Sequence, residues 1–172
     1  YQQKSNLTKE MGKFNNYIKS NIIYTYYNVY YSNDIKNKIL DIACGRGGDI
    51  LKFYYVIADI VVGTDIELET IHSPLGPISR YNKEKKMHPD YPPMHFIHAD
   101  SARRFEYEEQ INALGQMSKE NSDLFNKFFN GKTTFSRVNC SFAIHYFLKN
   151  EDIWNAFCDN INTYLREGGI FT

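Results

Sequence analysis

The amino-acid sequence predicts an α/β fold with a mostly parallel sheet and helices on both of its faces. Short apolar runs rich in β-branched residues alternate with segments of helical periodicity along the chain. A glycine-rich turn at 45–48 follows the first apolar run, and Asp65 and Asp100 follow the second and third. Because the carboxyl ends of the strands line the ligand crevice of such sheets, we expect a binding site at these turns.

Length and composition indicate a single domain over residues 1–172 that can bury a sizeable core. Twenty basic and twenty acidic residues balance, so any nucleic-acid site must be a local basic patch. The widely spaced Cys44, Cys140 and Cys158 are expected to be reduced, buried thiols of a cytosolic type. No stretch is typical of a signal peptide or a membrane span. The chain stops inside a predicted strand, so we expect a fragment that lacks its C-terminal part.

Residues 1–37 are expected to form an N-terminal helical region. Apolar residues at helical spacing predict an amphipathic helix over 7–27, with one face formed by Met11, Phe14, Ile18 and Ile22. Asn15, Asn16 and Lys19 lie on or beside its more polar face. Residues 24–37 are rich in Tyr and Asn and are expected to be a packed helix end followed by a connection.

The next part of the chain contains three predicted strands with helices between them. In chain order we expect a strand at 38–43, a helix over 49–55, a strand at 58–64, a short helix around 79–86 and a strand at 94–99. The short spacing of the first three elements suits a right-handed βαβ unit. Ser73-Pro74 and Gly76-Pro77 cannot continue a regular helix, so 71–79 is expected to be a loop or a broken helix.

The last part of the chain continues the alternation. The polar segment 105–130 is expected to end in a helix that closes at Asn130-Gly131-Lys132. A fourth strand is predicted at 136–142, and Ile153, Phe157, Ile161 and Leu165 predict a helix over 150–166. We expect Gly168-Gly169 to stop this helix and a fifth strand to open at 170–172.

The glycine turn and the two aspartates favour an adenosyl ligand. Gly45, Gly47 and Gly48 let a ligand approach the main chain closely, although a tight structural turn would use the same residues. Asp65, twenty positions after Gly45, can accept hydrogen bonds from ribose hydroxyls, and Asp100 from an adenine amino group. Either residue could otherwise be a solvated turn aspartate. A nicotinamide dinucleotide is less favoured, because Ile50 occupies the third glycine position of the longer motif.

Other chemistry-bearing residues are sparse. His145 and Tyr146 follow the fourth predicted strand and could face a substrate, or could simply pack. We find no convincing nucleophile triad and no clustered metal ligands, and His88, His95 and His98 are too scattered to form a site.

Four blocks of the sequence resemble the mRNA cap guanine-N7 methyltransferases, which use S-adenosylmethionine. In the order typical of the family they are Phe14-Asn-Asn-Tyr-Ile-Lys19, the segment from Leu40 to Lys52, Ala99-Asp-Ser101 and Ser141-Phe-Ala-Ile-His-Tyr146. The first and last blocks are far more specific than the glycine turn. Ser73-Pro74 and Ser79-Arg80-Tyr81-Asn82 resemble members from large DNA viruses and some protists. The resemblance implies a Rossmann-like class I methyltransferase fold, truncated here after the fifth strand.

The resemblance also implies roles for individual residues. In the cofactor site, Lys19 would contact the methionine carboxylate, Ala43 and Gly45 the methionine and ribose region, Asp65 the ribose, Asp100 the adenine end, Ser141 a further part of the cofactor, and Tyr146 the region of the methyl group. In the cap site, Asn15 would touch the guanosine ribose, Arg46, Lys52 and Arg80 the phosphates, and His145 the guanine. Charge-assisted contacts suit phosphates, although a single basic residue is more often a solvated charge.

The sequence departs from the family pattern at several positions. Ala43 replaces a glycine, so a glycine-only main-chain conformation is not expected there. Ser141 replaces a glutamine and shortens a cofactor contact, Tyr17 replaces a tryptophan, and Arg46 replaces a lysine with a different geometry. The family places a further cap-binding acid and aromatic residue after the fifth strand, where this chain stops.

The implied activity is methyl transfer from S-adenosylmethionine to N7 of the guanosine cap of mRNA, with S-adenosylhomocysteine as product. N7 carries a free lone pair, so alignment is sufficient and no general base is needed. His145 and Tyr146 would be positioning residues. The implied partner is capped RNA, with other capping domains or a stimulatory subunit left open, and no membrane. The implied location is the nucleus or cytoplasm, or the virion or viral factory for a viral member.

Three alternatives remain at this point: a methyltransferase with another substrate, a degenerate non-catalytic binding subunit, and a nicotinamide dehydrogenase.

Overall fold

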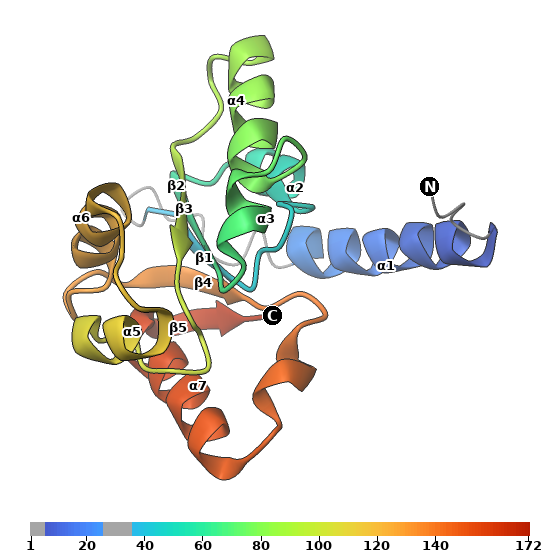
Figure 1. The fold of residues 1–172 in the computed structure, drawn as a ribbon. Coiled ribbons are helices and arrows are strands. Elements are labelled where there is room, and N and C mark those ends of the chain that lie inside the picture. Colours follow the sequence, from blue (N-terminus) through green and yellow to red (C-terminus); the bar gives the residue numbers. More distant parts are fainter. Residues whose placement is uncertain (1–5, 26–35) are drawn as a thin grey trace.

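The computed structural model describes residues 6–25 and 36–172, which form a five-stranded sheet flanked by helices (Figure 1). All neighbouring strands pair in parallel, in the order β3-β2-β1-β4-β5. This confirms the predicted fold class. The Tyr- and Asn-rich connection falls mainly on residues 26–35, which lie outside the described ranges.

The elements follow the predicted alternation. The strands are β1 (Lys38–Ile42), β2 (Ile60–Asp65), β3 (Met94–His98), β4 (Phe135–Asn139) and β5 (Leu165–Phe171). The helices are α1 (Asn6–Thr25), α2 (Ile50–Tyr55), α3 (Leu68–His72), α4 (Pro77–Met87), α5 (Tyr107–Leu114), α6 (Lys119–Phe128) and α7 (Glu151–Tyr164), with a 3₁₀ turn, η2 (Ile144–Phe147). Among the described residues, no helix has both the length and the apolar character needed to cross a bilayer.

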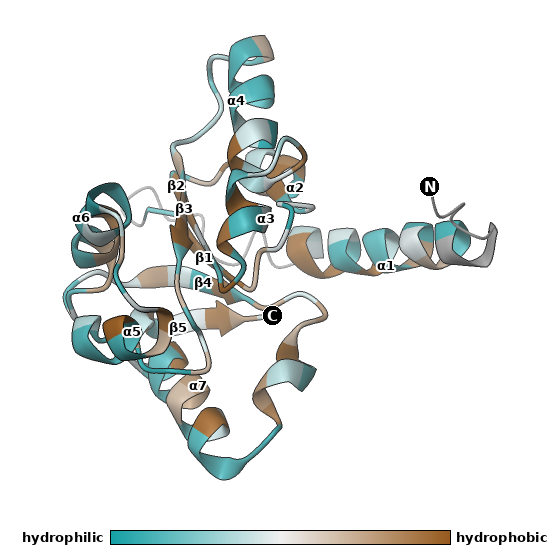
Figure 2. Cartoon of the chain, in the orientation of Figure 1, coloured by the Kyte–Doolittle hydropathy of each residue, from teal (hydrophilic) through white to brown (hydrophobic). Residues whose placement is uncertain are grey.

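The sheet separates two hydrophobic cores, because successive strand residues point to opposite faces. Ile39 and Val61 belong to the core beneath α2 and α3, whereas Leu40 and Val62 belong to the core formed with α6 and α7. Figure 2 shows hydrophobic segments along the strands between these layers. Both faces are therefore covered, as an all-parallel sheet requires.

Helix α1 attaches to the domain through its C-terminal half and projects from it (Figure 1). Ile23 is buried, but Met11, Phe14 and Ile22 of the apolar face are 58%, 62% and 41% exposed. The side that approaches the domain instead carries Lys19, which pairs with Asp49. An ion pair near the glycine turn thus orients the helix, and its apolar face is left largely uncovered.

Three predicted boundaries near the C-terminus are wrong, among them the start of the fifth strand, which begins at Leu165 instead of 170. The fourth strand ends at Asn139 instead of 142, because the chain turns sharply and Phe142 adopts a positive φ of 59°. The last helix ends at Tyr164, where Leu165 is already extended. Gly168, with φ of 68°, lies within β5 at an irregularity of the β4–β5 register, so the glycines accommodate a bulge there and do not stop the helix.

Two regions whose helices the sequence left uncertain, around 71–79 and over 105–130, each contain two helices. Residues 68–87 form α3 and α4, and Pro77 occupies the first turn of α4, where its missing N–H costs nothing. Residues 107–128 form α5 and α6, separated by Gly115 at φ of 77° and by Ser118, whose side chain caps α6.

Candidate cofactor and cap site

The glycine turn joins β1 to α2 at the carboxyl edge of the sheet. Gly45 and Gly47 have φ of 52° and 68°, in the left-handed region that favours glycine. A Cβ on Gly47 would lie 2.6 Å from Ile50 Cδ1 and 2.9 Å from Pro77 Cβ, so no larger residue fits. The turn therefore depends on glycine both for its conformation and for close packing against α4.

Asp65 is fixed by the glycine turn itself. Its Oδ2 accepts a hydrogen bond from the Gly45 N–H at 2.7 Å, and its Oδ1 accepts one from the Glu67 N–H at 2.9 Å. Each carboxylate oxygen retains a lone pair, which is the arrangement needed to accept two adjacent hydroxyl groups. Because Asp65 is only 8% exposed, its orientation is well determined.

The loop after β3 carries Asp100, and two buried side-chain amides hydrogen-bond its backbone. Gln110, which is fully buried, accepts from the Asp100 N–H at 2.8 Å and donates to the Asp100 and Arg104 carbonyls, each at 2.9 Å. Asn160 donates to the Arg103 carbonyl at 2.7 Å and accepts from the Phe105 N–H at 2.7 Å. Every hydrogen bond that the structure gives these two side chains goes to the loop, and neither residue was predicted from the sequence.

A hollow of about 560 Å³ lies between these two turns and the chain after β4. Six of the seven predicted cofactor residues line it: Ala43, Gly45, Asp65, Asp100, Ser141 and Tyr146. Its lining also includes Ile66 and Phe142, which are 52% exposed apolar residues beside predicted ones. Ile66 could have been predicted from the sequence as a lining residue, because it is an apolar residue directly after Asp65. The hollow is large enough for a nucleoside ligand.

Lys19 does not line this hollow and forms an ion-pair network instead. Its Nζ lies 2.8 Å from Asp49, and the Nζ of Lys52 lies 3.0 Å from the same carboxylate. Lys52 also donates to Asn16 Oδ1 at 2.7 Å. Asp49 and Lys52 are buried, so this network fixes α1 to the glycine turn and leaves one net positive charge there.

A second hollow, of about 350 Å³, lies on the other side of the glycine turn. Gly47, Gly48, Lys52 and Arg80 line it together with Asn16 and Glu84. Two predicted phosphate contacts, Lys52 and Arg80, are thus brought together. Arg80 donates through Nε to the Leu75 carbonyl at 3.1 Å, which orients its guanidinium.

The other three predicted cap residues do not line this hollow. Arg46 is exposed on the glycine turn, and Asn15 is half-buried on α1. His145 is exposed in η2, with its ring centroid 4.1 Å from that of Tyr146. The structure places His145 next to Tyr146, a lining residue of the first hollow.

Ala43 and Ser141, the two departures from the family pattern in the predicted cofactor site, both affect the local structure. Ala43 adopts φ of 54°, so it takes the left-handed conformation despite its side chain. The expectation that the main chain would avoid such a conformation is wrong, and the cost is about 1 kcal/mol. The Ser141 hydroxyl donates to Asn139 Oδ1 at 3.3 Å, which directs it toward the end of β4.

Asp41 is buried beneath the glycine turn. Burial, followed by the charge of Asp49, raises its pKa to about 8, although Asn139 donates to its carboxylate at 2.5 Å.

All three cysteines are free, as expected, but only Cys140 is fully buried. Burial raises the pKa of Cys44 and raises that of Cys140 to about 12, so neither is a reactive thiolate. Within the described ranges, no three His, Cys, Asp or Glu side chains come together as a metal site.

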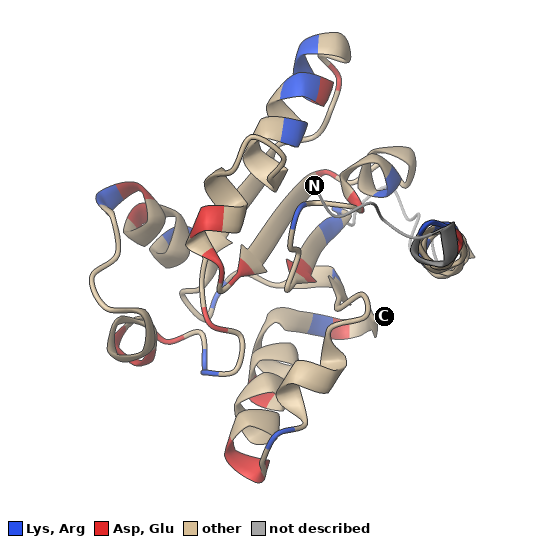
Figure 3. Cartoon of the chain, turned by 45° about the vertical axis from the view of Figure 1, so that its right-hand side comes forward, with Lys and Arg blue, Asp and Glu red and all other residues tan. Residues whose placement is uncertain are grey.

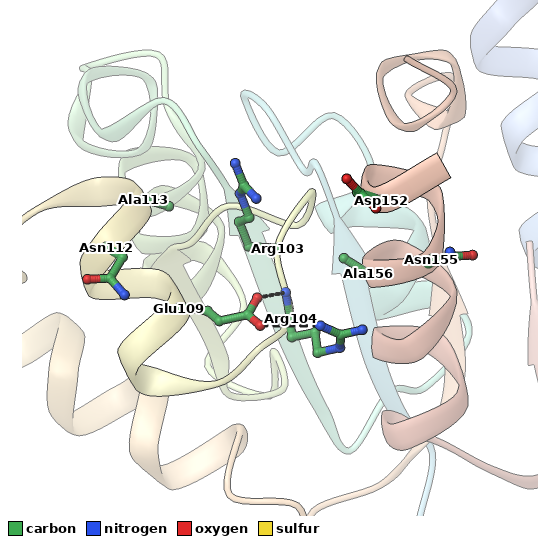
Figure 4. Close-up of a pocket in the computed structure, with 8 residues that line it drawn as sticks. All are labelled: Arg103, Arg104, Glu109, Asn112, Ala113, Asp152, Asn155 and Ala156. Atoms are coloured by element: carbon green, nitrogen blue, oxygen red, sulfur yellow. Dashed lines mark hydrogen bonds and ion pairs between the residues drawn. The ribbon is translucent and has the colours of Figure 1, made fainter. Parts of the chain in front are cut away.

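A third hollow, of about 510 Å³, lies between α5 and α7 behind the Asp100 loop (Figure 4). Arg104 pairs there with Glu109 at 3.3 Å and also with Asp159 of α7, which Figure 4 does not draw, at 2.8 Å. None of the residues predicted to be functional lines this hollow. Its ion pairs join the Asp100 loop to α5 and α7. They therefore help to hold the loop that lines the first hollow.

Comparison with known proteins agrees with this geometry. Residues 2–172 match the family model described as an mRNA (guanine-N(7))-methyltransferase domain. A probable mRNA-capping enzyme of Acanthamoeba polyphaga mimivirus is 41% identical over 172 residues, covering 98% of this chain and 14% of that protein. An mRNA cap guanine-N(7) methyltransferase of Caenorhabditis briggsae is 32% identical over 162 residues, covering 94% of this chain and 37% of that protein.

Among solved structures, the plantazolicin methyltransferase BpumL, in complex with a pentazolic desmethylPZN analog and SAH, has a TM-score of 0.55. It is 16% identical to this chain, with 97% of this chain and 49% of that chain covered, and this likeness concerns the fold alone. The predicted Rossmann-like class I methyltransferase fold is confirmed, and so is the resemblance to the large-DNA-virus type. This chain spans well under half the length of the relatives named above. It belongs to the mRNA (guanine-N(7))-methyltransferase family.

Proposed function

We propose that this domain transfers a methyl group from S-adenosylmethionine to N7 of the guanosine cap of mRNA. The observation that carries the proposal is the pair of hollows flanking one glycine turn. Asp65 and Asp100 line the first, beside Glu67 and Lys149, and Lys52 and Arg80 line the second, beside Glu84. A nucleoside cofactor and a phosphorylated guanosine would then meet across the turn. Family membership makes the cap the first substrate to test.

The lining of the first hollow fits S-adenosylmethionine. Asp65 has free lone pairs for the ribose hydroxyls, and Asp100 presents its carboxylate to the adenine end. Ala43 and Gly45 would contact the methionine part of the cofactor through their backbone. The positive charge of the Lys19–Asp49–Lys52 network would attract the methionine carboxylate. When bound, the cofactor supplies a methyl group activated by the positively charged sulfur.

In this proposal the protein contributes alignment and electrostatics. Guanine N7 is already a nucleophile, so no side chain has to remove a proton. Tyr146 would close over the region of the methyl group, and the neighbouring His145 would orient the guanine. Arg46, Lys52 and Arg80 would hold the phosphates and Asn15 the guanosine ribose. Alignment of this kind can contribute ~7–11 kcal/mol to a barrier.

The direct test is methyl transfer from labelled S-adenosylmethionine to a guanosine-capped RNA by the full-length protein. Asp65→Ala should abolish tight cofactor binding, because the ribose loses its acceptor and the backbone N–H groups of Gly45 and Glu67 each lose a hydrogen bond. Equal activity of this variant would contradict the assignment of the cofactor site. Uncapped RNA of the same sequence is the matched control, since it lacks the acceptor N7.

Two alternatives would both leave the cap unmethylated, but they differ in cofactor binding. A methyltransferase with another substrate would bind the cofactor but leave the cap unmethylated. A degenerate, non-catalytic subunit, which the altered residues Ala43 and Ser141 would suit, would not bind S-adenosylmethionine at millimolar concentration. Calorimetric titration with the cofactor separates these outcomes and also tests the dehydrogenase alternative.

The similarity to a probable capping enzyme of which this chain covers 14% supports a further proposal about context. We propose that other capping domains or a stimulatory subunit act with this domain on capped RNA, and that the cap site is completed by an acid and an aromatic residue supplied after β5. The proposed setting is the nucleus or cytoplasm, or the viral factory or virion if the source is a virus.

A further inference from the structure

Helix α4 is the most basic helix beside the second hollow. Between Pro77 and Met87 it carries Arg80, Lys83, Lys85 and Lys86 against the single acid Glu84, in a chain whose formal net charge is zero. Figure 3 shows these basic positions along the helix where it projects from the sheet. The positive charge is therefore local and is concentrated on a protruding element.

Three of these four cations keep donors for a ligand, since Arg80 uses only its Nε, on the Leu75 carbonyl. Lys85 is occupied, because its Nζ donates to the carbonyls of Pro89 and Tyr91. Arg80, Lys83 and Lys86 are exposed, and in the part of the chain that the structure describes none of them forms an ion pair. Their spacing of three residues places them in succession along the helix, over a rise of about 9 Å. We call these three residues the α4 ridge.

The ridge begins at the proposed cap site. Arg80 lines the second hollow, and Pro77 at the start of α4 packs against Gly47 of the glycine turn. From there the helix projects outward (Figure 1), and Lys83 and Lys86 follow Arg80 along it toward its end at Met87. Glu84 also lines the hollow and is the only acid on the helix. A polyanion leaving the hollow would meet cations along the outer side of α4.

We propose that the α4 ridge binds phosphates of the first nucleotides that follow the cap. This inference rests on the proposed function, because it takes the second hollow as the site of the cap phosphates. Lysine ammonium groups on flexible stems suit phosphates at variable positions. Such contacts carry no sequence information, so the ridge strengthens binding of any capped transcript without selecting among sequences. It would distinguish a capped RNA chain from a free cap nucleotide.

The test compares two substrates with one double variant, Lys83→Ala/Lys86→Ala. With a capped RNA of about ten nucleotides, KM should rise about 3- to 10-fold, because two exposed charge contacts are lost. With the cap dinucleotide GpppG, KM should not change. The logarithmic salt dependence of RNA binding should weaken by roughly 1.4, about 0.7 for each lost phosphate contact. Arg80 is left intact because it lines the cap hollow.

The matched control is Lys119→Ala/Lys132→Ala, which removes two exposed lysines at the ends of the α6 region. It lowers the net charge equally and should leave both substrates unaffected. If the ridge variant leaves the KM for capped RNA unchanged, or if the KM values for RNA and dinucleotide rise together, the inference is overturned. A general charge effect, with both double variants equally impaired, would overturn it as well.

Direct binding separates this inference from the proposed function. Fluorescence anisotropy with labelled capped RNA needs no catalysis. If the wild-type protein binds the RNA through the ridge but methylates neither substrate, only the proposed function fails. If it methylates both substrates while the ridge variant binds RNA as tightly as the wild type, only the ridge fails.

Discussion

Gln110 holds the main chain of Asp100 at both its amide and its carbonyl. Its Oε1 accepts from the Asp100 N–H at 2.8 Å and its Nε2 donates to the Asp100 carbonyl at 2.9 Å, and the Gln110 side chain is fully buried. A buried amide on α5 thus fixes the residue expected to face the adenine. This relationship makes Gln110 a positioning residue for the cofactor site, although it does not line the hollow.

We therefore expect Gln110→Met to weaken cofactor binding. The substitution preserves volume but leaves buried N–H and carbonyl groups of the loop without partners, at a cost of about 2–4 kcal/mol in unfolding free energy. The dissociation constant for S-adenosylhomocysteine should rise about 10-fold, as measured by calorimetry. Gln110→Glu is the size-matched variant: it keeps an acceptor for the Asp100 N–H but places a second carboxyl oxygen against the Asp100 and Arg104 carbonyls, so it should also weaken binding. An unchanged affinity in both variants would remove the positioning role.

A second prediction concerns the carboxylate between two lysines. Asp49→Asn should lower the free energy of unfolding by about 3 kcal/mol, because Lys19 and Lys52 lose their common counter-ion in a largely buried place. Urea denaturation measures this loss. Adding Lys52→Met to Asp49→Asn should recover part of it, since one unpaired ammonium group is removed. Simple additivity of the two single effects would show that the residues do not act as a network.

A third prediction follows from the strained Ala43. At φ of 54°, a glycine relieves about 1 kcal/mol of steric cost but adds conformational entropy to the unfolded chain. Ala43→Gly should therefore raise the free energy of unfolding by up to about 0.5 kcal/mol. Ala58→Gly, at a buried position without a positive φ, is the control and should be destabilising. If both variants lose similar stability, the strain at Ala43 is not significant.

A fourth prediction concerns pH and Asp41. Its pKa is raised to about 8 in the folded protein, mainly by burial and then by Asp49, against about 4 when unfolded. Protonation therefore favours the folded state, so the contribution of Asp41 is fully present below about pH 4 and is lost as pH rises to about 8. Asp41→Asn, which keeps an acceptor for Asn139, should remove this dependence. Urea denaturation between pH 5 and 9 measures it, and parallel profiles for the two proteins would contradict the assignment.

Much of the fold could be predicted because strands and glycine turns are local signals. The apolar runs before Ala43, Asp65 and Asp100 form β1, β2 and β3, as expected. The errors arose where local signals were ambiguous. Gly168-Gly169 resembles a helix stop but lies at a strand irregularity, and the apolar face of α1 gave no indication that an ion pair would orient the helix.

The sequence by itself determined the alternation of strands and helices, the glycine turn and the aspartates at the carboxyl ends of β2 and β3, because these depend on neighbours along the chain. Only the tertiary structure decided which side chains support them. Gln110, ten residues after Asp100, and Lys19, thirty residues before Asp49, reach their partners through packing of α5 and α1. Hydrogen bonds and ion pairs between distant segments depend on the folded geometry, and spacing along the chain does not encode them.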